Sequence, residues 1–244
     1  MRALTASTLL GAWERALSQS PAQRALTLLQ LVSAELPPER LAALTIGQRD
    51  AQLLNLRESA FGSQMTGMAA CPACSRQLEL SFTVSSVRVA PPTDPVGPCT
   101  LTHADYQVEF RLPNSDDVTS LTTDLDLPAN QRRLLERCLL NLRRNGVAVP
   151  FDELPAELRI AVSDRMAETD SQVDVQLSLA CPDCGHRWLA PLDILSYLWT
   201  EIHAWATRLL RDIHTLASAY GWREADILAL SPWRRQAYLE MINR

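Results

Sequence analysis

Two Cys-x-x-Cys motifs carry the clearest chemistry in this sequence. Cys71 and Cys74 form the first motif, Cys181 and Cys184 form the second, and a proline follows the first cysteine of each pair. Each motif offers two thiolates to one metal ion, and Zn²⁺ is commonly held by four such ligands in a tetrahedron. We therefore predict one shared structural Zn²⁺ site. Because four thiolates close the coordination sphere, we do not expect a catalytic ion.

Other uses of these cysteines fit the sequence less well. A single Cys-x-x-Cys pair can be redox-active or consist of two buried thiols. A thioredoxin-like role is disfavoured because the motif occurs twice and neither copy opens the helix of a βαβ unit. A deaminase is disfavoured because its signature needs His-x-Glu, which the sequence lacks, and a proline where Ala70 and Ala180 stand. His186 could replace one cysteine as a ligand, but four thiolates are already available.

Short strands are the elements expected to position the two motifs. Residues 173–179 alternate apolar and polar side chains and run into the second motif, and residues 186–189 can return as the hairpin partner. Residues 78–82 alternate in the same way after the first motif. Gly185 stands where a zinc knuckle needs positive φ. The pattern predicts a zinc-ribbon-like element whose halves are separated by residues 75–180, so the metal would join distant parts of the chain.

Composition indicates an ordinary globular protein. The 244 residues are 47% hydrophobic and 21% charged, enough for one large domain or two modest ones. The formal net charge is −5, and all 23 basic residues are Arg. Because nucleic-acid affinity depends on clustered positive charge, we do not expect a nucleic-acid partner.

The N-terminus is predicted to be a helix rather than a targeting segment. Polar residues interrupt the apolar stretch after Met1, and Glu14 and Arg15 end it. No run approaches the roughly 18 apolar residues of a membrane span. Six cysteines, four of them in the two motifs, fit a reducing cytoplasm better than a disulfide framework.

The remaining pattern predicts an α+β, mainly helical fold with an inserted region between the ribbon halves. Helices are expected over residues 3–17, 21–34 and 46–61. The inserted region is predicted to contain a Pro-rich connector, a strand over 105–112, a short helix from Asn114 or Ser115, a helix from Leu127 that ends at Asn145 and Gly146, and a helix over 155–168. The predicted parts of the chain are 1–62 (helical), 63–90 (first half of the ribbon), 91–170 (inserted strand and helices), 171–192 (second half of the ribbon) and 193–244 (C-terminal helices).

The C-terminal region shows the strongest helical periodicity. Apolar residues recur three and four apart from Leu195 to Leu216, which predicts a helix of about seven turns. A short helix through 226–230 and a terminal helix ending near Ile242 are expected to follow. His203 and His214 lie ~16 Å apart along the long helix, too far to ligate one ion.

Five of the six tryptophans follow residue 187. They can pack in the core around the long helix, or they can form a partner-binding face, since Trp and Arg dominate interface hot spots. The candidate partner-binding residues are Trp199, Trp205, Trp222 and Trp233.

We find no catalytic motif in the sequence. It contains no Gly-rich phosphate loop, no Gly-x-Ser-x-Gly elbow and no metalloprotease helix. We therefore expect neither an enzyme nor a small-molecule substrate.

A set of motifs, considered together, resembles a known family. The motifs are Leu44 to Asp50, Leu54 to Gly62, the two Cys-Pro-x-Cys turns, Phe110 to Ser115, His186-x-Trp188 and Tyr220 to Ser231. Over residues 40–242 the chain is similar to the baseplate hub assembly chaperone family of T-even-like phages, which has relatives in bacterial contractile injection systems. The resemblance implies partners among baseplate, hub or spike proteins and a role in building the baseplate or its central hub.

Two other functions stay open. The protein could be a permanent structural subunit, in which case it would be incorporated in the assembled particle. It could also be a nucleic-acid-binding zinc ribbon, but only Arg76 and Arg187 lie near the cysteine motifs.

Overall fold

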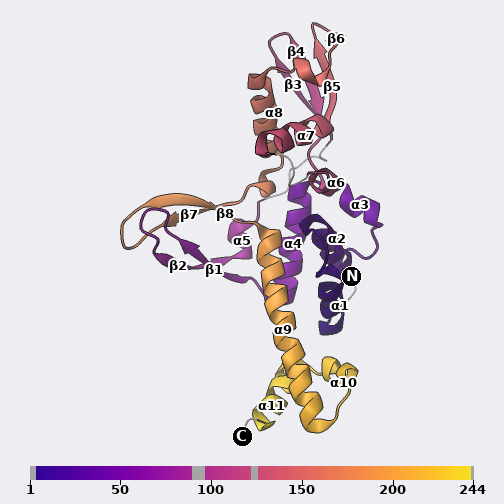
Figure 1. Cartoon of the computed structure of the whole chain (residues 1–244), viewed down its shortest axis with the longest axis vertical. Helices are drawn as coiled ribbons and strands as arrows, with labels where there is room; N and C mark the ends of the chain where they lie inside the picture. The colour runs from indigo at the N-terminus through magenta and orange to yellow at the C-terminus, as the bar shows by residue number, and fades with distance from the viewer. Residues whose placement is uncertain (1–3, 90–96, 122–125, 243–244) are drawn as a thin grey trace.

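The computed structural model describes residues 4–89, 97–121 and 126–242. Figure 1 shows an elongated molecule with helices at its centre, a sheet and helices at one end, two β-hairpins projecting from the side, and the C-terminal helices at the other end. The prediction of an α+β, mainly helical fold is confirmed. Among the described residues, no helix has the length and apolarity to cross a membrane.

The helices are α1 (Ala6–Ala16), α2 (Pro21–Val32), α3 (Pro38–Ala42), α4 (Ile46–Phe61), α5 (Val84–Val87), α6 (Ser115–Thr119), α7 (Leu127–Cys138), α8 (Ala156–Thr169), α9 (Ile194–Tyr220), α10 (Glu224–Ala229) and α11 (Pro232–Ile242), with short 3₁₀ turns η1 (Phe151–Glu153) and η2 (Ser171–Val173). The strands are β1 (Gln64–Ala70), β2 (Gln77–Thr83), β3 (Cys99–His103), β4 (Tyr106–Phe110), β5 (Leu139–Arg144), β6 (Val147–Ala148), β7 (Gln176–Ala180) and β8 (Arg187–Pro191).

Helices α1, α2, α4 and α9 form the central body. Thr5, Ser20 and Thr45 each begin a helix with a reciprocal capping box, which typically contributes about 1 kcal/mol per helix. The apolar faces of these helices share one core that contains the fully buried Leu28 and Leu198. Each such leucine contributes about 1.5–3 kcal/mol when it is removed from water.

A buried arginine ties α4 to α9. The side chain of Arg57 is 3% exposed and donates two hydrogen bonds to the Glu201 carboxylate, at 2.9 and 2.8 Å. It also donates to the carbonyl of Gly62 at the end of α4 (2.6 Å). Because a charged group is buried only where partners satisfy it, this pair fixes the register between the two helices.

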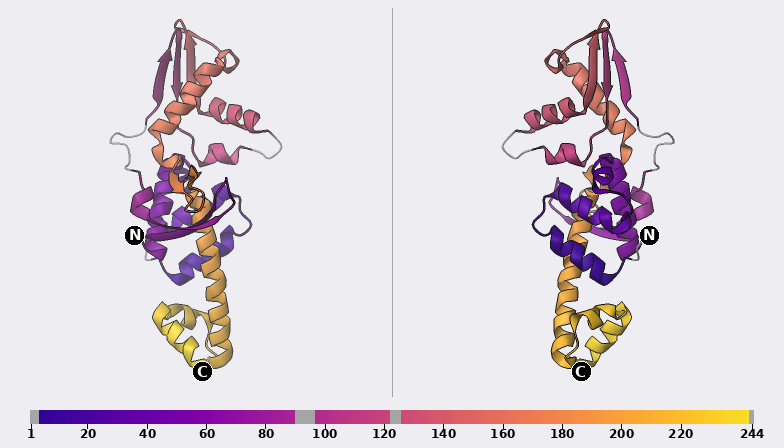
Figure 2. Two further views of the ribbon diagram at one scale, coloured as in Figure 1. Left: turned by 90° about the vertical axis from the view of Figure 1, so that its left-hand side faces the viewer. Right: turned by 90° about the vertical axis from the view of Figure 1, so that its right-hand side faces the viewer.

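Strands β3 to β6 form an antiparallel sheet in sequence order, and α7 and α8 accompany it at one end of the molecule. We call this part, residues 97–121 and 126–169, the sheet unit. It has a core of its own, separate from the core of the body, and the members of that core include Phe110, Leu142 and Leu158. Figure 2 shows the sheet unit and the C-terminal helices at opposite ends of the long axis.

The predicted helix from Leu127 to Asn145 is wrong in its second half. Helix α7 ends at Cys138, and residues 139–144 form β5, which pairs with β4. Asn145 and Gly146, predicted as the end of the helix, form the turn of the β5–β6 hairpin with φ of 50° and 81°. Positive φ at both positions of an Asn-Gly pair is typical of a type I′ hairpin turn. The inserted region therefore contains four strands instead of one.

Several short elements have no counterpart in the sequence prediction. Strand β3, which begins at Cys99, pairs with β4, and β1 pairs with β2 along its whole length. Helices α3 and α5 are also additional. The predicted connector falls largely on residues 90–96, which lie outside the described part of the chain.

The sheet unit contacts the body beside the start of α4. The N–H of Ile46 donates to the carbonyl of Pro113 (3.1 Å), and Thr45 and Asn114 form an isolated antiparallel bridge. The Phe110 to Ser115 motif, which lies inside the sheet unit, therefore joins the unit to the body.

The chain returns to the body at the same place. The Asp170 carboxylate accepts the N–H of Gly47 at 2.9 Å, where an anion complements the positive end of the α4 dipole. A Cβ added to Gly47 would lie 2.0 Å from Asp170 Oδ1, so this close approach requires glycine. Residues 113 and 114 inside the sheet unit and Asp170 at its C-terminal connection thus both meet the N-terminus of α4.

Helix α9 runs from the body to the C-terminal end of the molecule (Figure 1), and its predicted length is confirmed. Gly221 ends it in the left-handed conformation (φ 65°), and α10 and α11 fold back against α9. The rings of Tyr220, Trp222 and Tyr238 pack together with centroids 4.7–5.8 Å apart.

Candidate metal centre

Each Cys-x-x-Cys motif lies in the turn of a β-hairpin. The first turn joins β1 to β2 and the second joins β7 to β8, and both pairs are antiparallel. We call these two hairpins the arm, because they project together from the side of the body (Figure 1). The predicted strands that flank both motifs are therefore present.

The two turns share one backbone geometry. In the first, the carbonyl of Cys71 accepts the N–H of Ser75 (2.8 Å), and the N–H of Cys71 donates to the carbonyl five residues later (2.9 Å). The second turn, which begins at Cys181, repeats both bonds. Ser75 and Gly185 take the same left-handed position, with φ of 62° and 72°. Each turn thus presents its two sulfurs in the same way.

The four sulfurs converge on one point. Those of Cys71, Cys74, Cys181 and Cys184 all lie within 4.8 Å of one another. The Sγ–Sγ distance is 3.7 Å between Cys71 and Cys184 and 3.6 Å between Cys74 and Cys181. A tetrahedron with metal–sulfur bonds of ~2.3 Å has edges of about 3.8 Å, whereas a disulfide has an S–S length of about 2.05 Å. The spacing therefore fits four ligands of one ion.

The thiols of this cluster differ in how readily they ionise. The backbone N–H of Cys184 points at the Cys181 sulfur and is the main cause that lowers the pKa of Cys181 to about 7. At Cys74 the backbone N–H of Arg76 acts in the same sense, but the three neighbouring thiols outweigh it and raise the pKa to about 12. A cation among the four sulfurs would favour their thiolate forms.

Little else holds the arm together at its tip. Cys71 and Cys181 are buried, but β7 and β8 contain no buried residue. Arg76 and Asp183 join the two turns at 3.3 Å, and both side chains are more than half exposed, so this ion pair adds little. His186 stacks on Trp188 and is not part of the sulfur cluster. An ion bound by the cysteines would be the main link between the two hairpins.

The candidate partner-binding tryptophans do not form one cluster. Trp199 is half-buried under Arg24, whose guanidinium lies 4.5 Å from the ring centroid. Trp222 belongs to the aromatic cluster at the end of α9. Trp205 lines a cleft between α9 and α11, and Trp233 is 77% exposed.

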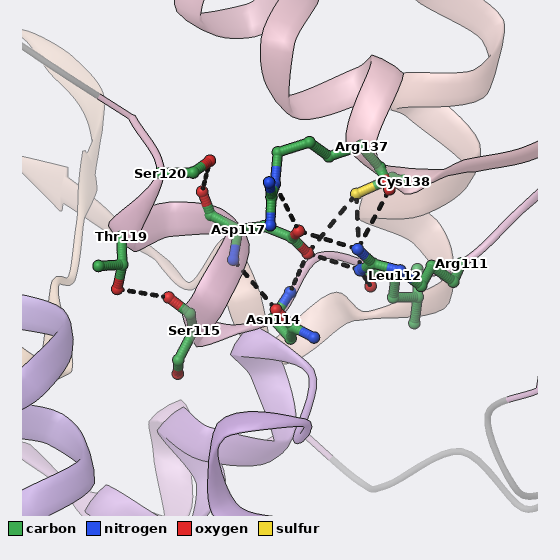
Figure 3. Close-up of polar contacts among 9 residues, drawn as sticks. All are labelled: Arg111, Leu112, Asn114, Ser115, Asp117, Thr119, Ser120, Arg137 and Cys138. Carbon is green, nitrogen blue, oxygen red and sulfur yellow. Dashed lines mark hydrogen bonds and ion pairs between the residues drawn. The ribbon is translucent and has the colours of Figure 1, made fainter. Parts of the chain in front are cut away.

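A second charged site, absent from the sequence prediction, lies where the sheet unit meets the body. Asp117 is fully buried at the start of α6. Arg111 donates two hydrogen bonds to its carboxylate (2.5 and 2.8 Å), and Arg137 and the N–H of Asn114 donate one each (both 3.0 Å) (Figure 3). Only the Asn-x-x-Asp capping pattern of residues 114–117 marked this site in the sequence.

Hydrogen bonding decides the charge of Asp117. Burial opposes ionisation, but the donors, Arg111 first, outweigh it and hold the pKa of the carboxyl below its usual range. Burial, and after it the negative charge of Asp117, raises the pKa of the Cys138 thiol to about 11. Because Arg111, Arg137 and Asn114 already occupy both carboxylate oxygens, the site joins elements rather than offering a reactive group.

Comparison with known proteins gives one match. A family model described as T4 bacteriophage base plate protein matches residues 5–196. The match includes the N-terminal helices and ends at the first turn of α9, before the Tyr220 to Ser231 motif. No curated protein and no solved structure matches the chain.

Proposed function

Because this chain belongs to the T4 bacteriophage base plate protein family, we propose that it assists assembly of the baseplate, or of the central hub and spike, of a contractile tail or a tail-like injection system. The family match over residues 5–196 is the observation that supports this proposal. The partners are baseplate, hub or spike proteins. The protein acts in the cytoplasm of the producing bacterium.

The proposal includes one structural Zn²⁺ held by Cys71, Cys74, Cys181 and Cys184. It is supported by the sulfur spacing and by the thiolate donor set, which Zn²⁺ prefers. When bound, the ion supplies a cross-link between the β1–β2 and β7–β8 hairpins. The chain's own contribution is to hold each sulfur pair in place through the backbone bonds of its turn.

We propose a binding role without enzymatic activity. Four cysteine ligands leave no open coordination position for a substrate. The buried Asp117 carboxylate is fully hydrogen-bonded, and its neighbour Cys138 has a raised pKa, so neither is poised as a base or a nucleophile.

Deletion of the gene in the producing strain tests the proposal. We expect no complete particles from the deletion strain and restored particles after complementation with the wild-type gene. A complementing gene with Cys99→Ser, which changes a cysteine outside the cluster, is the control for substituting a cysteine in this chain. Normal particle yield without the protein would overturn the proposed function.

The composition of wild-type particles separates an assembly factor from a permanent subunit. Quantitative mass spectrometry is expected to find no stoichiometric copy of this chain in purified particles. A fixed number of copies per particle would support the alternative of a permanent baseplate subunit.

A further inference from the structure

A charged cleft lies between α9 and α11, in the part of the chain beyond the family match. Its volume is about 400 Å³, and it is open to solvent. The residues that give it its character are Trp205, Arg208, Arg211 and Asp212 from α9 and Arg235 and Gln236 from α11. Three guanidinium groups and one carboxylate therefore line a single opening.

Arg235 is the residue that distinguishes this cleft from an ordinary basic surface. It is 6% exposed, although its side chain carries a full positive charge. Its guanidinium has five N–H donors, and within the described part of the chain it makes one hydrogen bond, to the Leu230 carbonyl at a long 3.4 Å. A buried cation with so few acceptors calls for an anion from outside.

The carboxylates of the described residues do not neutralise the arginines that line the cleft. Among the described residues, no carboxylate lies within ion-pair distance of Arg208, Arg211 or Arg235. Asp212 is near enough to act on Arg235 only at longer range. Burial lowers the pKa of Arg235 and raises the pKa of Asp212, so each group is partly desolvated without a close partner.

We propose that this cleft binds carboxylate groups of an acidic segment of a protein partner. This inference rests on the proposed function, in which the chain handles other particle proteins. A guanidinium matches a carboxylate through two parallel N–H···O bonds, and Gln236 adds a further donor. Trp205 in the cleft supplies an aromatic surface of the kind that usually surrounds such contacts.

Asp212 favours a carboxylate over a phosphate. The repulsion between Asp212 and a bound anion scales with the charge of that anion. A doubly charged phosphate therefore loses more from Asp212 than a singly charged carboxylate does. The open shape of the cleft also suits a side chain on an extended segment better than an enclosed small molecule.

Peptide titration of the full-length, zinc-loaded protein tests the inference. The probe is a capped peptide of alternating Glu and Leu, compared with the same peptide carrying Gln in place of Glu. Nitrogen-15 NMR follows the Trp205 indole and the Arg235 side chain, and calorimetry gives the Kd. We expect saturable shifts at both residues with the Glu peptide only.

Paired variants locate the site. Arg208→Gln with Arg211→Gln removes two exposed cleft charges without touching the core, and Arg223→Gln with Arg234→Gln removes two exposed charges outside the cleft. We expect the cleft variant to raise the Kd by about tenfold or more, because charge-assisted bonds are lost. The control should stay within about twofold, since both proteins change net charge equally.

Three results would overturn the inference: equal Kd values for the two variants, equal binding of the Gln peptide, or shifts at Arg235 with inorganic phosphate but not with the Glu peptide. The last result would identify a site for free anions. Normal particles from the deletion strain would instead overturn the proposed function, so the two failures are distinguishable.

Discussion

The Asp117 carboxylate and the four cysteine thiols differ in how their negative charge is balanced. Asp117 is a single anion surrounded by donors from Arg111, Arg137 and Asn114, so it ionises without further help. The cysteines place four acidic groups within 4.8 Å, and each thiolate makes the next harder to form. Protein groups complete the Asp117 site, whereas the proposed metal ion would complete the cysteine cluster.

Replacing one sulfur tests the metal centre. We expect Cys181→Ser to abolish stoichiometric zinc and to lower the melting temperature by roughly 5–10 °C, because binding free energy contributes to folding and 1 kcal/mol shifts the Tm of a chain this size by about 2–4 °C. Elemental analysis and calorimetry provide the two measurements. Cys99→Ser should keep the zinc, and a Cys181→Ser protein with wild-type zinc and Tm would contradict the assignment.

Removing the charge of Asp117 tests the buried network. We expect Asp117→Asn to lower the free energy of unfolding by about 2–4 kcal/mol at neutral pH. This loss is slightly smaller than for a fully buried ion pair, because Arg111 and Arg137 are 33% and 41% exposed. The folded pKa lies below the unfolded value of about 3.9, so this stabilisation is present above that pH and is lost as pH falls through the folded pKa.

Urea denaturation of both proteins from pH 3 to pH 7 provides the measurement. Because wild type and variant carry the same four cysteines, the difference between their unfolding free energies cancels the pH dependence of the metal site. That difference should be constant above about pH 5 and shrink below pH 4. A difference that does not change with pH would show that Asp117 is not a charged partner in the native state.

The sequence marks these two sites very differently. Paired cysteines leave a short motif with fixed spacing, so the sequence predicted that these four belong together, and the structure brings their sulfurs within 4.8 Å of one another. The donors to Asp117 come from the end of β4, from the cap of α6 and from the last turn of α7. Only the fold brings these three segments together, and no local pattern indicates that Arg111 and Arg137 converge.

At the level of elements, helices with long apolar periodicity and strands with clear alternation, such as β4 and β7, were predictable, whereas β5 was not. The heptad-like pattern of α9 extends over many turns, and chance rarely produces it. In β5 the run from Leu139 to Leu142 continues the apolar pattern of α7, so helix and strand look alike there. The Asn145–Gly146 pair does not decide between them, because it closes a hairpin as readily as it ends a helix.

The junction between α4 and the sheet unit can be tested by adding one methyl group. We expect Gly47→Ala to lower the free energy of unfolding by about 1–2 kcal/mol, because the new Cβ displaces the Asp170 carboxylate that accepts the Gly47 N–H. Gly11→Ala is the matched control: its Cβ meets nothing closer than 3.6 Å, so alanine should stabilise α1 by about 0.5–1 kcal/mol.

A double-mutant cycle identifies the cause. In an Asp170→Ala background, Gly47→Ala should no longer destabilise the protein, and denaturant unfolding measures the change. An equal cost in both backgrounds would place the clash elsewhere.

At the scale of the whole molecule, the arm and the body are stabilised by different interactions. The core of the body unites α1, α2, α4 and α9, whereas the tip of the arm has two buried cysteines and few other contacts. The sheet unit is anchored to α4 through Asn114 inside the unit and through Asp170 at its C-terminal connection, independently of the cysteines. Loss of the metal should therefore open the arm before it disturbs the rest.

Limited proteolysis can show this order. Because the chain has no Lys, trypsin cleaves only after Arg, and Arg76 and Arg187 follow the two cysteine turns. We expect a zinc chelator to speed cleavage at both by about tenfold or more, while the buried Arg57 stays protected. Mass spectrometry identifies the cut sites. Simultaneous cleavage at Arg57 would mean that arm and body unfold together.

The two halves of the cysteine cluster are also separated in time. Cys74 and Cys181 are 107 residues apart, so a ribosome that adds 5–20 residues per second makes the second half about 5–20 s after the first. During that interval the nascent chain carries two thiols and no complete ligand set. The proposed cross-link can therefore form only late in the synthesis of each copy, after the β7–β8 hairpin has been translated.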